Sequence, residues 1–169
     1  MKIAPTPLWL WCAALLLAGC SGFHLRGSQS VPFSTLYIPG ANTGIALDLK
    51  RNIQAGTDAK VVDSPKGADA ILEISDERRE KIILSLSGTG RVREFRLRYS
   101  VSFRVHDAKG NEYVPRSTVQ LSRDVTYDDS EILAKEAEEQ LLYRDMQTDM
   151  VQQLLHRLSA ARAPKPAVS

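Results

Sequence analysis

The sequence predicts a two-layer α+β domain: a mostly antiparallel or mixed sheet of about four strands, with two helices on one face. Three observations support it. Residues 94–105 alternate strictly between polar and apolar side chains, the pattern of a half-buried strand. Residues 131–159 instead place apolar residues at helical spacing. Along the chain, a short strand and helix precede several strands and the long helix, which favours one sheet covered by both helices.

An apolar N-terminal stretch precedes this domain. Lys2 followed by an apolar run over residues 8–18 is typical of a secretory signal, and the run is too short to span a membrane comfortably. It ends in Leu-Ala-Gly-Cys, which is typical of the bacterial lipobox. We therefore expect a signal peptide over residues 1–19 and lipid attachment at Cys20. An ordinary signal peptide with a coincidental cysteine is the alternative.

The acyl chains expected on Cys20 would anchor the protein stably in the membrane, because several acyl chains bind a membrane firmly whereas a single chain binds it only marginally. Ser21 stands where a retention signal would have Asp, which is similar to the bacterial signal for transfer to the outer membrane. Residues 20–33 then form the lipidated N-terminus and a short tether, residues 34–159 a single domain, and residues 160–169 a disordered Ala- and Pro-rich tail.

The composition of the mature chain excludes several classes of function. Its 150 residues suffice for one domain, and its 21 basic and 20 acidic residues argue against a nucleic-acid-binding protein. Cys12 would be lost with the signal and Cys20 would be acylated. The mature fold would thus have no thiol for a disulfide, a metal thiolate or a nucleophile.

The first half of the domain shows short elements. Residues 35–38 form a brief strand ended by Pro-Gly, and residues 45–55 form a short amphipathic helix with Ile45, Leu49 and Ile53 on one stripe. Residues 60–62 are a candidate for a further strand.

Longer strands follow. From residue 70 onward the even positions are apolar, so we expect these to face the core: Leu72, Ile74, Ile82, Leu84 and Leu86. Turns at 87–90 and 108–111 flank the alternating strand, and residues 119–127 continue the pattern, with Arg123 interrupting the apolar side.

The long helix is expected over residues 131–159, with Asp128, Asp129 or Ser130 as its cap. Its apolar stripe should pack across the sheet and consists of Leu133, Ala137, Leu141 with Leu142, Met146, Met150, Leu154 and Leu158.

The sequence contains no convincing catalytic or metal-binding pattern. His24, His106 and His156 lie far apart, and none belongs to an HExxH or related motif. The run 87–90 (Ser-Gly-Thr-Gly) lies between strands and is not a nucleophile elbow. We predict a protein that is not an enzyme and needs neither a metal nor another cofactor.

Arginines cluster around the turn before the long strand. Arg91 and Arg93 flank this turn, while Arg96, Arg98 and Arg104 share the polar side of the strand, and Arg116 lies across the following hairpin. Guanidinium groups bind phosphate bidentately, so such a surface suits phosphorylated or acidic ligands. The alternative is a solvated face balanced by carboxylates on adjacent strands, for which the candidates are Glu73, Glu77, Glu94 and Asp124.

The chain resembles the LptE family of lipopolysaccharide-assembly lipoproteins. The run 20–27 (Cys-Ser-Gly-Phe-His-Leu-Arg-Gly) is similar to the family's opening Cys-Gly-(Phe/Trp)-His-Leu-Arg, with Ser21 as a one-residue insertion. The run 93–97 (Arg-Glu-Phe-Arg-Leu) before the long strand, and the helix from 133–135 (Leu-Ala-Lys) through 145–146 (Asp-Met), are similar in order and spacing.

This resemblance implies a non-enzymatic partner that plugs the outer-membrane barrel LptD in a 1:1 complex, supports its assembly and helps place lipopolysaccharide in the outer leaflet. It also implies lipopolysaccharide binding through basic residues, one near the turn before the long strand and one a lysine near the start of the final helix. The lysine maps onto Lys135. The first position falls near Ser87 or Gly88, where the nearest cations are Arg91 and Arg93. Arg96 and Arg98 complete the set of candidates.

The resemblance places the protein on the periplasmic side of the outer membrane, held by its lipid anchor and largely inside the partner barrel. An outer-membrane lipoprotein that regulates a periplasmic enzyme or secretion complex is the competing hypothesis. Such a regulator would usually need a long tether. Only about a dozen residues separate Cys20 from the first strand, which favours the barrel partner.

Overall fold

The computed structural model describes residues 30–162 of the chain. The signal peptide expected over 1–19, Cys20, most of the tether and residues 163–169 of the expected tail lie outside this range. Within residues 30–162, the helices are too short or too polar to cross a membrane. The elements, in order, are β1 (Thr35–Tyr37), α2 (Gly44–Gly56), β2 (Lys60–Val62), β3 (Ala70–Leu86), β4 (Val92–His106), β5 (Glu112–Thr126), the 3₁₀ turn η2 (Asp129–Glu131) and α3 (Ile132–Ser159).

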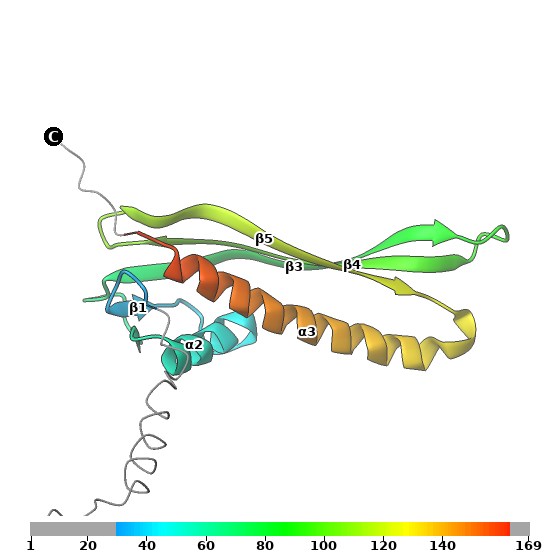
Figure 1. Cartoon of the computed structure of the whole chain (residues 1–169), viewed down its shortest axis with the longest axis horizontal. Helices are drawn as coiled ribbons and strands as arrows, with labels where there is room; N and C mark the ends of the chain where they lie inside the picture. Colours follow the sequence, from blue (N-terminus) through cyan, green and yellow to red (C-terminus); the bar gives the residue numbers. More distant parts are fainter. Residues whose placement is uncertain (1–29, 163–169) are drawn as a thin grey trace, which may run out of the picture.

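The strands form one mixed sheet in the order β2-β1-β3-β4-β5. β1 runs parallel to both β2 and β3, and the three long strands pair antiparallel. Both helices lie on the same face of the sheet (Figure 1). The α+β prediction is confirmed, with five strands rather than about four, because the three-residue β2 pairs with β1 after the α2 crossover.

The hydrophobic core occupies one end of the molecule, which we call the proximal end. The alternation predicted for β4 is confirmed, since Leu97, Tyr99, Val101, Phe103 and Val105 are at most 1% exposed. These side chains meet α2 and the second half of α3, whose buried residues include Ile45, Leu49, Ile53, Met146, Met150, Leu154 and Leu158. The three long strands continue well beyond this core toward the distal end, where the β3–β4 turn lies (Figure 1).

The prediction for residues 70–86 is wrong in its second half because β3 contains a β-bulge. Ile74 pairs with Phe103, whereas Asp76 pairs with Ser102, so one residue is inserted in the ladder. A one-residue shift moves every following side chain to the other face. Odd positions from Glu77 to Ile83 therefore face the helices, and a second register shift follows between Ile83 and Ser85. Of the residues expected in the core, Ile82 lies opposite Arg96, and Leu84 and Leu86 are 39% and 57% exposed.

The prediction for α3 is confirmed in its second half and wrong in its first. Met146 and Met150 are fully buried, but Leu133 is 82% and Leu141 55% exposed. The step from Leu141 to Met146 is five residues, which turns about 140° around a helix of 3.6 residues per turn. The apolar residues thus form two stripes on different sides. The expected cap is present one turn earlier: the Asp128 carboxylate accepts a hydrogen bond from the Ser130 backbone amide at the start of η2.

Candidate functional site

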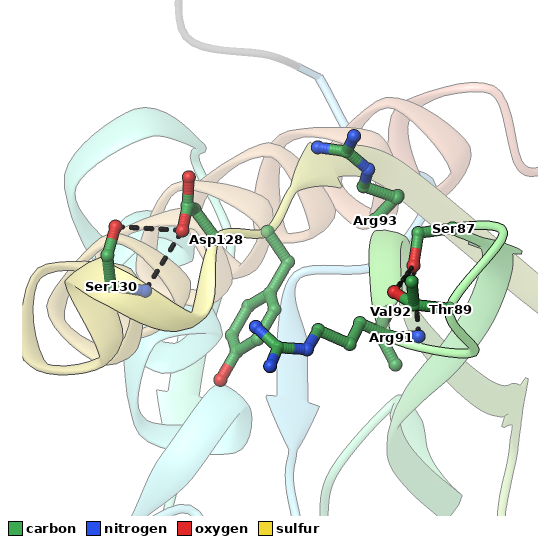
Figure 2. A pocket seen from close by; sticks show the side chains of 8 residues that line it. Ser87, Thr89, Arg91, Val92, Arg93, Asp128 and Ser130 are labelled. Carbon is green, nitrogen blue, oxygen red and sulfur yellow. Dashed lines mark hydrogen bonds between the residues drawn. The ribbon is translucent and has the colours of Figure 1, made fainter.

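The distal end brings together two loops that are far apart in sequence. The turn between β3 and β4 lies beside the connection from β5 to α3, and the Tyr127 amide donates a 2.8 Å hydrogen bond to the Arg93 carbonyl. Between them is a hollow of about 300 Å³, shown in Figure 2. We call it the tip hollow, and it is lined by Ser87, Thr89, Arg91, Val92, Arg93, Tyr127, Asp128 and Ser130.

One wall of the tip hollow is a tightly hydrogen-bonded turn. The Ser87 hydroxyl bonds the Thr89 hydroxyl at 2.9 Å and accepts from the Arg91 amide at 3.1 Å. The Gly90 amide donates to the Ser87 carbonyl at 2.9 Å, with Gly90 at φ +79°, a conformation that favours glycine. These bonds fix the direction in which Arg91 leaves the turn.

A third irregularity in the β3–β4 ladder positions Arg93. Glu94 pairs with Ser85, but Val92 pairs with Leu86, so Arg93 is the extra residue on its strand. Bulges of this kind redirect side chains at functional sites. Arg93, on β4, thereby lines the tip hollow together with Arg91, which lies in the turn before β4. Asp128 and Ser130 lie on the opposite wall (Figure 2).

The opposite wall carries one ionised carboxylate. Asp128 accepts hydrogen bonds from the Ser130 amide at 2.9 Å and the Ser130 hydroxyl at 2.8 Å. These bonds, with the nearby charges of Arg93 and Lys135, hold the pKa of Asp128 below its ordinary value. The tip hollow thus has two guanidinium groups against one carboxylate among its lining residues, and serine and threonine hydroxyls beside them.

Lys135 lies in a neighbouring, more acidic hollow of about 520 Å³. Its ammonium group donates to Glu138 at 2.8 Å, and this hydrogen bond raises the pKa of Lys135. Two cations and three carboxylates line this second hollow, so it attracts an anion less than the tip hollow does. Its lining residues are Ser85, Arg93, Glu94, Thr126, Tyr127, Asp128, Glu131 and Lys135, and it shares Arg93 with the tip hollow.

Arg96 and Arg98 lie apart from both hollows, on the face of the sheet without helices. Arg96 makes a bidentate pair with Asp124, with both distances at 2.7 Å, and Arg98 lies 3.6 Å from Glu80. The Asp124 partner raises the pKa of Arg96, and Arg96 lowers that of Asp124. Arg104 repeats the arrangement with Glu73 at 2.7 Å. Arg96, Arg98 and Arg104 thus match the second alternative given by the sequence: a solvated face on which carboxylates of adjacent strands balance the arginines.

Sequence reasoning missed the hydroxyl groups of the site. Ser87 and Thr89 were interpreted only as turn residues, and Ser130 only as a cap candidate. Their proximity to Arg91 and Arg93 in space depends on the β4 bulge and on the loop that follows β5. A Ser/Thr-rich turn next to two arginines is the one local signal that pointed to them.

The fold and the tip hollow describe a small binding domain, and no group of three or more His, Cys, Asp or Glu within residues 30–162 is arranged to hold a metal. The family model LptE, described as lipopolysaccharide-assembly, matches residues 33–158, and the chain belongs to this family. It is therefore a non-enzymatic, outer-membrane-associated lipoprotein with a role in lipopolysaccharide assembly.

Two curated relatives carry the name LPS-assembly lipoprotein LptE. The protein of Photorhabdus laumondii is 27% identical over 154 residues, and that of Pectobacterium atrosepticum is 28% identical over 155 residues. Each alignment covers 89% of this chain and 83% of the relative. The resemblance noted in the sequence is thus confirmed over nearly the whole chain.

Solved structures of other lipoproteins share the fold. The solution structure of lipoprotein B from Nitrosomonas europaea is 45% identical, with a TM-score of 0.71, and the match covers 82% of this chain and 91% of that one. The crystal structure of rare lipoprotein B from Shewanella oneidensis is 25% identical, with a TM-score of 0.63, over 75% and 92% of the two chains.

Proposed function

We propose that this protein is anchored at Cys20, plugs an LptD-type outer-membrane barrel in a 1:1 complex, helps it assemble, and binds lipopolysaccharide while it is delivered to the outer leaflet. The relatives named as LPS-assembly lipoproteins support the general role. The tip hollow supports ligand binding, and the polar face of the sheet supports the plug.

The ligand proposal depends most on one observation: Arg91 and Arg93 line the same hollow as three serine and threonine residues. Arginine binds phosphate through two parallel N–H donors, and hydroxyls add further donors. Lipopolysaccharide presents phosphates on its lipid A portion. We therefore assign the phosphate contacts to Arg91 and Arg93, with Lys135 at the edge, and a structural role in the sheet to Arg96 and Arg98.

The face of the sheet without helices supports the plug. It carries cross-strand ion pairs and hydroxyl contacts, including the Ser102–Thr118 pair at 2.8 Å. The interior of an outer-membrane barrel is polar, so most of the surface that a plug presents to it should be polar. This face meets that requirement while the core lies on the other side.

Binding of purified lipopolysaccharide to the full chain tests the ligand. Replacing both Arg91 and Arg93 by Asp should weaken binding about tenfold or more, because charged hydrogen bonds contribute about 1.5–3 kcal/mol each. Lys135→Asp should weaken it less, because carboxylates already surround Lys135. Arg157→Asp, an exposed charge reversal on the second half of α3, is the matched control. Unchanged binding by the folded double variant would remove these arginines from the ligand site.

Purification from the native outer membrane tests the partner. The tagged lipoprotein should bring a large barrel protein in equal amount, together with lipopolysaccharide, in mild detergent. A free monomer or a periplasmic enzyme in its place would contradict the proposal and favour the regulatory lipoprotein instead.

A further inference from the structure

The outer side of α3, which points away from the sheet, carries an apolar stripe on its first half. Leu133, Ala137 and Leu141 are all exposed, Leu133 by 82% and Leu141 by 55%. We call these three residues the uncovered stripe. They lie four residues apart, so they follow one side of the helix over about 12 Å.

The same side of α3 is covered on its second half by α2. Val151 and Leu155 lie on the same side of α3 as the uncovered stripe, farther along the helix. They are only 2% and 6% exposed. The Gln147 side chain donates to Asp48 of α2 at 2.6 Å, and Gln152 donates to Asn52 at 3.5 Å. These two contacts flank Val151, which places α2 directly over this side of α3. α2 begins at Gly44, one turn before Asp48, and Figure 1 shows the first half of α3 extending beyond it.

The uncovered stripe cannot turn inward, because polar contacts fix the rotation of α3. The Tyr143 hydroxyl donates to the Glu80 carbonyl at 2.8 Å, and Arg79 donates to Gln147 at 2.6 Å. Lys81 pairs with Glu139 at 2.5 Å. All three contacts lie on the sheet side of the helix. The first half of α3 is thus held in place with its opposite side apolar and exposed.

The charges beside the uncovered stripe indicate what covers it. Glu136 lies along one border and Glu138 and Asp145 along the other, all exposed, while Arg144 follows the stripe at its end. The Lys135 ammonium lies 2.8 Å from Glu138 and offsets part of this charge. Three carboxylates against two cations still disfavour an anionic lipid surface and favour a surface with basic side chains. Interfaces with other proteins combine such a charged border with an apolar centre.

We propose that the uncovered stripe is a docking site for a protein segment that has an apolar centre and Lys or Arg at its edges, and that continues the layer begun by α2. The inference rests on the proposed function, since it assigns this segment to the barrel partner. It also separates two surfaces of the lipoprotein: the tip hollow for the phosphorylated ligand and the uncovered stripe for the protein.

Photocrosslinking in the native outer membrane tests the proposal. A photoreactive amino acid replaces Leu141 in the full chain, and a second variant carries it at Gln153, an exposed position on the second half of α3. Position 141 should crosslink to the barrel protein and position 153 should do so much less. Crosslinks from position 141 to a second copy of this chain or to lipid, or an absence of crosslinks there, would overturn the proposal.

Charge substitution supplies an independent measurement. The double variant Leu133→Glu with Leu141→Glu should recover at least tenfold less barrel protein than the wild type, whereas Gln153→Glu should recover the same amount. Circular dichroism and lipopolysaccharide binding should be unchanged in both variants. If the wild type recovers the barrel and the double variant recovers it equally, the docking site is overturned while the proposed function stands. If the wild type recovers no barrel, the proposed function fails and the docking site fails with it.

Discussion

The proximal and distal halves of this molecule use the same strands and the same helix, but different forces hold them together. In the proximal half, β4 and α3 enclose fully buried side chains such as Phe103, Met150 and Leu154. In the distal half, the side of β3 that faces α3 carries Glu77, Arg79 and Lys81 instead. A single bulge near Ser75 separates the two arrangements, which shows how one inserted residue converts a core-forming strand into a polar one.

The polar contacts between α3 and the distal strands, which we call the cation–aromatic seam, centre on Arg79 and Lys81. The Lys81 ammonium lies 4.3 Å from the Phe95 ring centroid, and the Arg79 guanidinium lies 5.2 Å from the Tyr99 ring and 5.5 Å from the Tyr143 ring. Burial, with the 2.7 Å hydrogen bond to Glu77, raises the pKa of Tyr99, so its hydroxyl stays a donor. The seam orients α3 without an apolar core beneath it.

The largest expected effect separates the two halves directly. Phe103→Asp should abolish cooperative folding, because loss of a buried Phe alone costs about 3–5 kcal/mol and an unpaired buried charge adds to it. Phe95→Asp, at a half-buried position on the same side of the same strand, should leave a folded protein with a lower melting temperature. Thermal unfolding followed by circular dichroism compares them. If both variants lost the same amount of thermal stability, the core would extend farther along β4 than the burial of its residues indicates.

A smaller effect is expected from the seam. Lys81→Ala should cost about 1 kcal/mol in the free energy of unfolding, as expected for one exposed ion pair plus a cation–π contact. Amide hydrogen exchange over residues 132–142 should increase, while exchange over residues 146–158 should not. Lys50→Ala, which removes the proximal ion pair with Asp63, is the control and should leave residues 132–142 unchanged. Uniform acceleration along α3 in the Lys81 variant would contradict a separate distal unit.

The smallest effect concerns pH at the proximal end. The Asp69 carboxylate accepts hydrogen bonds from the Thr35 and Ser34 amides, and the contacts with Thr35 contribute most to keeping the pKa of Asp69 below its ordinary value. A lowered pKa in the folded state adds stability above the unfolded pKa near 4, and this stability is lost as the pH falls through the folded value.

Wild type should therefore exceed Asp69→Asn in stability at pH 6 and approach it as the pH falls below about 4. Urea unfolding at a series of pH values measures this difference. A difference that does not change with pH would mean that the Asp69 charge adds nothing beyond its hydrogen bonds.

The sequence determined the features that depend on neighbouring residues alone. The strict alternation of residues 94–105 required one buried face on β4, and the stripe of Ile45, Leu49 and Ile53 required one buried face on α2. Arg91 and Arg93 were identified because their charges flank a recognisable turn. These patterns depend only on residues close together in the sequence, so they can be recognised without the tertiary structure.

Only the tertiary structure decided which way the remaining side chains face. The bulges in β3 and β4 arise from pairing between strands, and they turned Ile82 out of the core and Arg93 into the tip hollow. The position where α2 begins decided that Val151 is buried and Leu141 is exposed, although both are apolar residues on the same side of α3. The sequence lists apolar and charged positions, but contact with another element of the fold determines whether each becomes core or surface.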